Sequence, residues 1–324
     1  MTGEPVCVVI VNYNAGEMLV RCVRSVLAST VPVQVYVSDN GSTDGSLLNL
    51  RSALGDHPFV NVIENRANIG FARGNNVALP LLRCDYLLCL NPDAVLAENC
   101  LEKLVTAAER RTEFACFASR MIQSRRPDLL DGAGDAYHVS GLVWRRGHGS
   151  SVDESPYAHP MEVFSACAAA ALYRRKAVEA VGGFDDDFFC YLEDVDLGFR
   201  LRLAGYRCLY VPDARVAHVG SATTGKDSDF AVYHGHRNLV WTYVKNMPGW
   251  LFWLYLPQHI AANLCTIVWY AIKGRWRVIL KAKWDAIVGL RGMWSKRGKI
   301  QARRVVGAWE IRKMLEKGLP RRRR

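Results

Sequence analysis

Amide and carboxylate side chains stand directly after three apolar runs in the first hundred residues of the 324-residue sequence. In chain order they are Asn12 and Asn14 after residues 5–11, Asp39 after 33–37, and Asn91 and Asp93 after 86–90. Such side chains donate and accept hydrogen bonds, although a solvated loop needs only general polarity. Their recurrence predicts a ligand-binding site, because ligands of parallel α/β sheets bind beyond the carboxyl ends of the strands.

A second group of carboxylates opens a predicted helix further along the chain. The segment Y-L-E-D-V-D-L-G-F-R contains Glu193, Asp194 and Asp196. Carboxylates in the first turn of a helix are stabilised by the helix dipole, so they have a structural explanation beside any chemical one. Asp196 and Arg200 are four residues apart, which predicts an ion pair along the helix.

Alternating strands and helices must position these side chains. Strands are predicted at residues 5–11, 33–37, 60–63 and 86–90, and helices at 18–27, 46–54, 71–82 and 98–110. This alternation is typical of an α/β domain with a mostly parallel sheet and helices on both faces. The fingerprints G-x-G-x-x-G and G-x-x-x-x-G-K-[ST] are absent, which argues against an ordinary dehydrogenase or ATPase.

Charge divides the chain into two regions. Residues 273–324 contain 18 Lys and Arg against 3 Asp and Glu, whereas the other residues contain 24 and 28. An acidic body and a basic tail are expected to meet different partners. The cysteines form no C-x-x-C pair, so we expect buried free thiols, including Cys7, Cys22 and Cys89, and a reducing cytosol.

Five motifs together resemble glycosyltransferase family 2. They are V-N-Y-N at 11–14, D-N-G-S-T-D-G-S at 39–46, N-I-G-F-A-R-G-N-N at 68–76, N-P-D at 91–93 and Y-L-E-D-V-D-L-G-F-R at 191–200. Each is weak alone, but their order over residues 5–245 is similar to the family, and most of all to rhamnosyltransferases of bacterial surface-polysaccharide assembly. The resemblance implies a Rossmann-like GT-A fold, a nucleotide-sugar donor and a divalent metal ion.

The resemblance assigns donor-binding roles at the strand ends. Asp39 is expected to accept the imide N–H of the nucleobase, whereas Asp44 braces its own turn. The other residues expected to bind the nucleotide-sugar are Asn12, Asn14, Asn68, Gly70, Arg73 and Asn91. Gly70 and Gly74 are expected to let the backbone approach the nucleotide closely. Arg73 is either a phosphate ligand or a solvated helix residue.

The resemblance also implies a site for Mg²⁺ or Mn²⁺, which would neutralise charge on a pyrophosphate leaving group. Asp93 matches the last aspartate of the family's D-x-D motif, and His218 matches a histidine that completes the metal site in some relatives. A single histidine after a strand otherwise has a structural role. Asn91 replaces the first aspartate of the motif, so a lower metal affinity is expected.

On the acceptor side, Asp194 matches the family's general base. Such a base takes the proton of the attacking hydroxyl in an inverting transfer. Glu193 is expected to support it, and Arg237 and Asn238 are candidates for binding the acceptor pyrophosphate. A structural role is the alternative for Arg237.

The segment that follows is apolar and aromatic. Residues 249–272 contain no Lys, Arg, Asp or Glu and are long enough to cross a bilayer. Polar residues at the centre and several tryptophans favour a pair of interfacial or re-entrant helices over one span. A buried helical hairpin is the third interpretation. The basic residues that follow favour an anionic membrane surface over nucleic acid as the partner.

These observations predict a catalytic domain at residues 1–245, with a nucleotide-sugar half (1–120) and an acceptor half (121–245). Residues 246–324 are predicted to form a helical membrane-associating region. We predict an inverting transfer of L-rhamnose from dTDP-rhamnose to a polyprenyl-pyrophosphate-linked glycan, by a peripheral protein at the cytoplasmic face of the membrane. UDP-galactofuranose or a UDP-N-acetylhexosamine is the alternative donor. A non-catalytic membrane- or nucleic-acid-binding relative is the alternative class, although Asp93 and Asp194 are retained.

Overall fold

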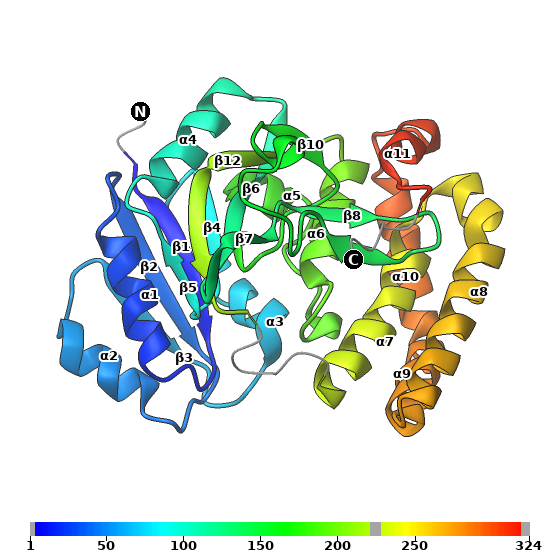
Figure 1. Ribbon diagram of the computed structural model, residues 1–324, viewed down its shortest axis with the longest axis horizontal. Helices are drawn as coiled ribbons and strands as arrows, with labels where there is room; N and C mark the ends of the chain where they lie inside the picture. Colours follow the sequence, from blue (N-terminus) through cyan, green and yellow to red (C-terminus); the bar gives the residue numbers. More distant parts are fainter. Residues whose placement is uncertain (1–3, 221–227, 319–324) are drawn as a thin grey trace.

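The structure is a computed structural model that describes residues 4–220 and 228–318 (Figure 1). A large sheet lies on one side of the molecule and a group of helices on the other. The strands of the large sheet are β1 Val6–Asn12, β2 Val33–Asp39, β3 Val60–Glu64, β4 Tyr86–Leu90, β5 Ala94–Leu96, β6 Phe114–Gln123, β7 Arg126–Gly132, β10 Met161–Val163, β11 Ala170–Arg174 and β12 Arg207–His218. The helices of this part are α1 Glu17–Leu27, α2 Ser46–Leu54, α3 Gly70–Asn76, α4 Cys100–Arg110, α5 Arg175–Ala180 and α6 Glu193–Leu203. β8 Asp135–Tyr137 and β9 Val143–Arg145 form a separate antiparallel pair.

The large sheet is parallel in its first half and mixed in its second. Its strand order is β10-β12-β6-β11-β4-β1-β2-β3, with β5 paired to β12 and β7 to β6. β4, β1, β2 and β3 are parallel, as strand–helix alternation predicts. β11 runs antiparallel to both of its neighbours, β4 and β6. The carboxyl ends of β1, β2 and β4 therefore meet at one edge of the sheet.

Both faces of the sheet are covered because β1 is apolar on both sides. Val8 and Ile10 pack with Leu19 of α1 in one core, and Cys7 and Val9 belong to a second core on the opposite face. The first core also receives α2 and α4, and the second receives α3, α5 and α6. Burial on both faces explains why β1 is a continuous apolar run rather than an alternating one.

The remaining helices pack against the sheet domain through a third core. They are α7 Asp229–Asn246, α8 Gly249–Ile272, α9 Trp276–Val288, α10 Leu290–Ala302 and α11 Ala308–Met314. Phe199 of α6 and Tyr137 of β8 share this core with Tyr243 of α7, Leu251 of α8 and Met293 of α10. The division of the chain at residues 245 and 246 stays a prediction, but α7 and α8 belong to one packing unit.

The predicted pair of helices at 249–272 is wrong, because α8 is one helix of 24 residues with Pro257 inside it. Pro257 removes a single intrahelical hydrogen bond and is exposed. His259 faces the protein, where its Nδ1 lies 2.7 Å from the carbonyl oxygen of Ser140. Lys283 of α9 donates to Asn263 Oδ1 at 2.5 Å. Polar side chains at the centre of α8 thus bond to protein and do not interrupt the helix.

The expectation of free thiols is wrong for two of the ten cysteines. Cys7 in β1 and Cys84, just before β4, form a disulfide, and their Cα atoms are 6.0 Å apart. The two strands are neighbours, which brings residues 77 positions apart within bonding distance. Cys22 and Cys89 are free and buried, as predicted.

Candidate active site

The carboxylate of Asp39 holds the loop after β2 in shape. Asp39 lies opposite Asn12 on the parallel strand β1, and both side chains are buried. Asp39 Oδ1 accepts hydrogen bonds from Asn12 Nδ2 at 2.7 Å and Ser42 Oγ at 2.6 Å. Its Oδ2 accepts from the backbone N–H groups of Gly41 at 3.1 Å and Ser42 at 3.0 Å. The structure thus adds a loop-forming role to the nucleobase contact that we expected of Asp39.

The loop after β1 is tied to the same turn. Asn14 has a positive φ of 51°, and its Oδ1 accepts from Thr43 N at 2.8 Å. Asp44 accepts from Gly16 N at 2.7 Å and from Ser46 N at 3.0 Å. Partial burial opposes ionisation of Asp44, but these hydrogen bonds hold its pKa below the usual value. Asp44 therefore braces the loop, the role that its place in the turn suggests.

The beginning of α3 lies against this edge. Asn40 Nδ2 donates to the carbonyl oxygen of Gly70 at 3.1 Å, and Gly70 N donates to Asn68 Oδ1 at 3.1 Å. Arg73, one turn into the helix, is exposed to solvent. Of the expected nucleotide ligands in this motif, the amide of Asn68 is therefore hydrogen-bonded to the backbone, and the guanidinium of Arg73 is exposed.

Protein atoms fill the space beside the two glycines of this motif. A Cβ on Gly70, whose φ is +83°, would lie 2.6 Å from the ring and the carbonyl oxygen of Phe189. A Cβ on Gly74 would lie 2.7 Å from Val11 Cγ1. We expected these glycines to admit a nucleotide, whereas here they admit a neighbouring loop and strand.

Asp93 and His218 form a buried pair beyond β4 and at the end of β12. His218 Nε2 lies 3.2 Å from Asp93 Oδ1 and has no hydrogen-bond partner among the described residues. Burial opposes both charges, but the pairing lowers the pKa of Asp93 and raises that of His218, which Asp131 also favours. An imidazole nitrogen beside a carboxylate oxygen is a donor set that fits Mn²⁺ or Mg²⁺. No third His, Cys, Asp or Glu completes a metal-binding group within residues 4–220 and 228–318.

Asp131, in β7, fixes the orientation of His218. Its Oδ2 lies 2.8 Å from His218 Nδ1 and accepts from Arg145 Nη1 at 2.6 Å. Despite burial, hydrogen bonds from His148 and His218 and the charge of Arg145 hold the pKa of Asp131 far below its usual value. Because Nδ1 is engaged, Nε2 is the nitrogen that faces Asp93. Carboxylate–imidazole pairs orient metal-binding histidines in this way.

The small-residue segment before β11 joins Asp194 to this group. Ala168 N donates to Asp194 Oδ2 at 3.0 Å, and Asn91 N donates to the carbonyl oxygen of Ala169 at 2.9 Å. Arg145 Nη2 donates to Cys167 Sγ at 2.9 Å. Asp194 is half-buried at the start of α6. The predicted base and the predicted metal ligands therefore lie around one segment. Asp93 and Asp194 come together there although more than 100 positions separate them in the sequence.

Two further carboxylates lie beside Asp194. Glu193 is buried, and desolvation together with the charge of Asp194 raises its pKa well above the usual value. Asp135 is also buried, and burial with the charge of Asp194 raises its pKa to about 7. Asp196 instead pairs with Arg200 at 2.8 Å, the ion pair predicted from their spacing.

The loop before α6 is clamped from two sides. Phe189, Tyr191 and Leu192 all have positive φ values, which are strained for these residue types. Asn238 of α7 is fully buried, and its Nδ2 donates to the carbonyl oxygens of Phe188, Cys190 and Tyr191.

Arg237 lies beside this clamp. Its Nη2 donates to the carbonyl oxygen of Phe188 at 3.0 Å, and its guanidinium lies 4.2 Å from the ring centre of Trp241. In this structure Arg237 and Asn238 hold the loop that carries Asp194. Their expected contact with an acceptor pyrophosphate stays a prediction.

Sequence reasoning missed Asp131, Asp135, Arg145 and Cys167. They lie on β7, β8, β9 and the segment before β11, which are short and irregular in sequence. Only the small-residue run A-C-A-A-A-A marked this region, and it carries no spacing that points to a particular partner.

Comparison with known proteins gives consistent matches. Residues 7–182 match the family model described as Glycosyl transferase family 2. The chain is 32% identical over 252 residues to an N-acetylglucosaminyl-diphospho-decaprenol L-rhamnosyltransferase of Mycobacterium tuberculosis, covering 70% of this chain and 80% of that protein. It is 25% identical over 224 residues to a rhamnosyltransferase of Escherichia coli K12, covering 66% of this chain and 83% of the relative.

Solved structures share the fold. GalNAc-T7, solved with UDP, GalNAc and Mn²⁺, superposes with a TM-score of 0.61 over 75% of this chain and 48% of its own, at 19% identity. A mannosyltransferase from Pyrobaculum calidifontis, solved with GDP-Man and Mn²⁺, gives a TM-score of 0.56 over 93% and 86%, at 17% identity. Both are glycosyltransferases, which supports the predicted GT-A architecture.

Proposed function

The chain belongs to glycosyl transferase family 2 and is a glycosyltransferase, and on this premise we propose that it moves L-rhamnose from dTDP-rhamnose to a glycan carried on a polyprenyl diphosphate. The relative from Mycobacterium tuberculosis is named for a rhamnosyl transfer to a sugar on diphospho-decaprenol. It matches this chain over most of both proteins, which supports the same class of donor and acceptor.

One observation carries the proposal within the site. The carboxylate of Asp194 and the pair Asp93–His218 lie around the segment 167–169, at the edge where β1, β2 and β4 end. A transferase needs a base near the acceptor and donor-binding groups near the leaving diphosphate. This arrangement offers both within one site.

Asp93 and His218 would hold the divalent metal, and the Nε2 of His218, which faces Asp93 Oδ1 and makes no hydrogen bond among the described residues, fits that role. The bound cation would neutralise charge that develops on the leaving diphosphate. Asn91 keeps its place at the end of β4 and offers an amide oxygen at most, so the affinity for metal is expected to be lower than with an aspartate.

Asp194 acts as the general base in the proposed transfer. It takes the proton of the acceptor hydroxyl while that oxygen bonds to the anomeric carbon and the bond to the diphosphate breaks, which inverts the configuration. Backbone N–H groups of Ala168 and Val195 hold the carboxylate in place. On the donor side, the loops fixed by Asn12, Asn14 and Asp39 supply the nucleotide-binding edge.

The acceptor places the reaction at a membrane. α8 is the one helix among the described residues that is long and apolar enough to cross a membrane, and 22% of its most apolar window is buried. We propose that α8 and α9 lie on the membrane surface as a peripheral anchor at the cytoplasmic face. Lys273 and Arg277, both exposed between or at the start of these helices, suit anionic headgroups.

A donor panel tests the proposal. Purified protein with Mn²⁺ is incubated with a polyprenyl-diphosphate-linked N-acetylglucosamine and dTDP-rhamnose, UDP-galactofuranose or UDP-N-acetylglucosamine, and products are separated by mass. Transfer from dTDP-rhamnose alone is expected, with inverted anomeric configuration by nuclear magnetic resonance. Transfer from a UDP-sugar in its place would contradict the assigned donor.

A further inference from the structure

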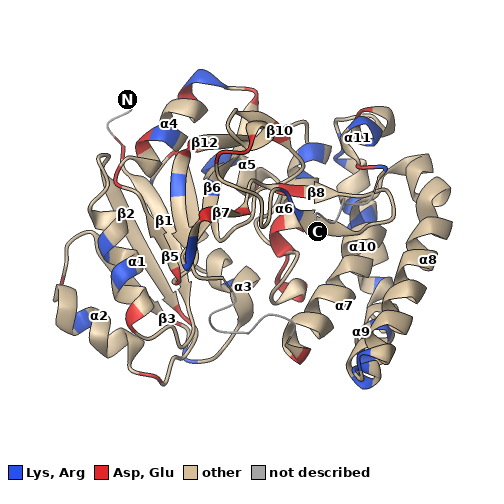
Figure 2. Ribbon diagram, in the orientation of Figure 1, with Lys and Arg blue, Asp and Glu red and all other residues tan. Residues whose placement is uncertain are grey.

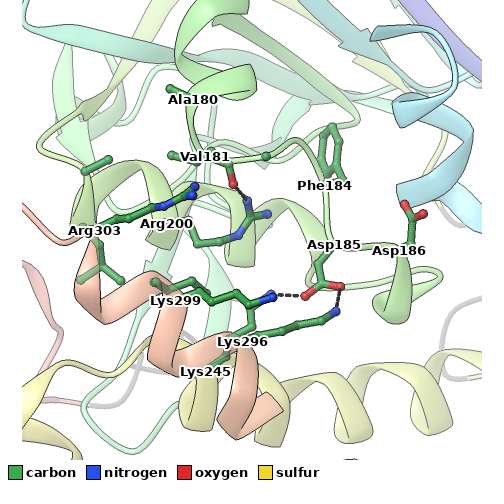
Figure 3. Close-up of a pocket in the computed structure, with 14 residues that line it drawn as sticks. Ala180, Val181, Phe184, Asp185, Asp186, Arg200, Lys245, Lys296, Lys299 and Arg303 are labelled. Atoms are coloured by element: carbon green, nitrogen blue, oxygen red, sulfur yellow. Dashed lines mark hydrogen bonds and ion pairs between the residues drawn. The ribbon is translucent and has the colours of Figure 1, made fainter. Parts of the chain in front are cut away.

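A cavity lies beside the later turns of α6, and its lining includes none of the candidate active-site residues Asp93, Asp194 and His218. It has a volume of about 400 Å³ and is enclosed by the end of α5, by α6 and by α10 (Figure 3). Apolar walls come from Val181, Leu203 and Ile300. Its charged lining residues are Arg200, Lys245, Lys296, Lys299, Arg303, Asp185 and Asp186. Cations therefore outnumber carboxylates around this space.

Most of the charges at the inner wall are already paired. Asp185 is in ion pairs with both Lys245 and Lys296. Lys245 also lies 2.7 Å from Asp196 Oδ1. Asp186 accepts a hydrogen bond from Asn76 Nδ2 at 2.6 Å. The ion pairs compensate the charge of Asp185, whereas Asp186 bonds to a neutral amide and keeps its own charge. Five cations against two carboxylates still leave the lining with an excess of positive charge.

Three cationic groups remain available to a ligand. Arg200 uses Nε for Asp196 at 2.8 Å and Nη1 for the carbonyl oxygens of Val181 and Gly183. Its Nη2 is buried and has no hydrogen-bond partner in the part of the chain that the structure describes. The residue is only 6% exposed, so bulk water does not supply one. A buried guanidinium N–H without a hydrogen-bond partner lowers the stability of the folded protein, so a bound ligand that supplies an acceptor atom would stabilise it.

The other two groups lie at the open side of the cavity. Lys299, in the last turn of α10, and Arg303, directly after the helix, are exposed and have no ion-pair partner among residues 4–220 and 228–318. Guanidinium and ammonium groups bind phosphate oxygens, the first by paired hydrogen bonds and both by charge. The buried N–H of Arg200 adds a donor that is shielded from water.

We propose that this cavity binds a phosphate or diphosphate group through Arg200 Nη2, Lys299 and Arg303, with the rest of the ligand against the apolar walls. The site is separate from the catalytic residues, and the proposal does not depend on the donor or acceptor assigned above. It adds a second anion site to a chain whose family assignment accounts for one.

The orientation of α10 indicates a soluble ligand rather than a lipid headgroup. Trp294 packs against Phe252 of α8, with ring centres 5.5 Å apart. Lys296 contacts Asp185 on the side of the sheet domain. Residues two positions apart on a helix, such as Trp294 and Lys296, differ in direction by about 200° around its axis. The cationic face of α10 therefore turns away from α8 and from the exposed apolar side chains of α8. A free phosphate compound can reach that face.

Calorimetric titration with inorganic diphosphate tests the proposal, in buffer with EDTA so that no divalent metal recruits the ligand to the active site. The test variant is Lys299→Gln/Arg303→Gln. The control is Arg277→Gln/Arg291→Gln, which removes two exposed cations outside the cavity. We expect one binding site in the unaltered protein, at least tenfold weaker binding by the test variant, and unchanged binding by the control. Equal affinity of the test variant and the unaltered protein would overturn the proposal, and so would no binding at all.

A vesicle arm separates the two sources of phosphate. Sedimentation with phosphatidylglycerol vesicles is expected to be unchanged for Lys299→Gln/Arg303→Gln, because these side chains face away from α8, and weaker for Arg277→Gln/Arg291→Gln, which removes a cation of α9. If the Lys299→Gln/Arg303→Gln variant lost vesicle binding, the cavity would hold a lipid headgroup and the inference of a soluble ligand would be wrong.

Discussion

Asp194 is fixed at both carboxylate oxygens, and this geometry suits a base better than a mobile side chain would. Val195 N donates to Oδ1 at 2.8 Å and Ala168 N donates to Oδ2 at 3.0 Å. Each oxygen keeps a further lone pair for an acceptor hydroxyl. The neighbouring Asp196 is buried in pairs with Arg200 and Lys245, which leaves it unsuited to take a proton from a substrate.

We predict that Asp194→Asn lowers turnover by about 10²–10⁴-fold, the usual contribution of a general base. Asparagine has nearly the same shape but accepts no proton at neutral pH. Donor binding is expected to stay within twofold, because the base faces the acceptor. Turnover is measured by product formation and donor affinity by calorimetry. The control is Asp229→Asn, which changes an exposed carboxylate at the start of α7. Full activity of Asp194→Asn would transfer the role to Glu193 or to the buried Asp135.

Asp131 acts at the residue scale through His218. We predict that Asp131→Asn raises the Mn²⁺ concentration for half-maximal activity by about 10–100-fold, the usual effect of losing such a partner. The matched control is Asp128→Asn, an exposed carboxylate on the same strand. The Mn²⁺ dependence of turnover and direct Mn²⁺ binding by electron spin resonance both report the change. An unchanged Mn²⁺ requirement in Asp131→Asn would remove His218 from the proposed metal site.

The sequence identifies the parts of the site that lie in motifs and not the parts that orient them. Asp93, His218 and Asp194 stand at predicted strand or helix ends, so their positions follow from the elements. Asp131 contacts His218 from β7, and Arg145 contacts Asp131 from β9. No periodic pattern marks the bounds of these two strands. Asn238, in H-G-H-R-N-L, is predicted only as a candidate for binding the acceptor pyrophosphate, whereas its buried side chain donates to three carbonyl groups of the loop before α6.

At the scale of elements, the turn at Asp186–Phe188, α7 and α10 meet at a junction around the carboxylate of Asp185. Asp185 pairs with Lys245, which is 1% exposed, and with Lys296. Burial opposes ionisation of Asp185, but the charges of the two lysines hold its pKa below the usual value. The junction joins the loop that carries Asp194 to the helices beside it.

We predict that Asp185→Asn lowers the free energy of unfolding at pH 7 by about 1–3 kcal/mol, because the buried Lys245 loses one of its two carboxylate partners and keeps Asp196. The pKa of Asp185 is lower in the folded state, so its contribution is fully present above its unfolded pKa near 4 and falls as the pH drops below that value. The difference between the two proteins should therefore shrink in acid. Urea unfolding at pH 7, 5 and 3.5 measures it, with Asp153→Asn, an exposed loop carboxylate, as the control. A difference that is constant with pH would contradict the ion-pair explanation.

Strands and their directions were predicted correctly where a repeating sequence pattern determines them, and they were not predicted where tertiary packing determines them. The alternation of strands and helices indicated the parallel strands β1 to β4. An apolar run does not indicate strand direction, so the antiparallel β11 could not be predicted from A-A-L-Y-R. The helix predicted at 71–82 ends at Asn76, and a 3₁₀ turn follows at Leu79–Leu81 with Pro80 inside it. Pro257, by contrast, lies inside α8, where one lost hydrogen bond does not end the helix.

At the scale of the whole molecule, α8 and α9 expose many apolar side chains and bury two polar ones, His259 and Lys283, which is unusual for helices that face water. Figure 2 shows basic residues on α9, α10 and α11, beside a domain with more acidic residues. The exposed apolar side chains of α8 and α9 are Trp250, Trp253, Leu254, Ile260, Leu264, Val268, Trp269, Ile272, Trp276, Leu280, Trp284, Ile287 and Val288. Buried His259 and Lys283 bond to Ser140 and Asn263 on the inner side. A bilayer surface satisfies this distribution, whereas a transmembrane span of α8 would break the bonds of its inner side.

Point substitutions test this surface better than truncation, because removing α8 to α11 would uncover Trp241 and Tyr243 of the third core. We predict that Trp253→Ser/Leu264→Ser/Val268→Ser on α8 loses at least tenfold of its binding to phosphatidylglycerol vesicles. Leu48→Ser/Phe59→Ser, exposed beside the parallel half of the sheet, is the control and should bind normally.

Salt should weaken vesicle binding by the unaltered protein without abolishing it, because ions screen the basic residues but not the apolar contact. Sedimentation at about 0.05 M and 1 M salt separates the two contributions, since the screening length falls to about 3 Å at the higher concentration. The α8 variant retains the charge and loses the apolar contact, so its residual binding should vanish in 1 M salt. Undiminished vesicle binding by this variant at both concentrations would show that another surface meets the membrane, and the acceptor would then approach Asp194 from a different side.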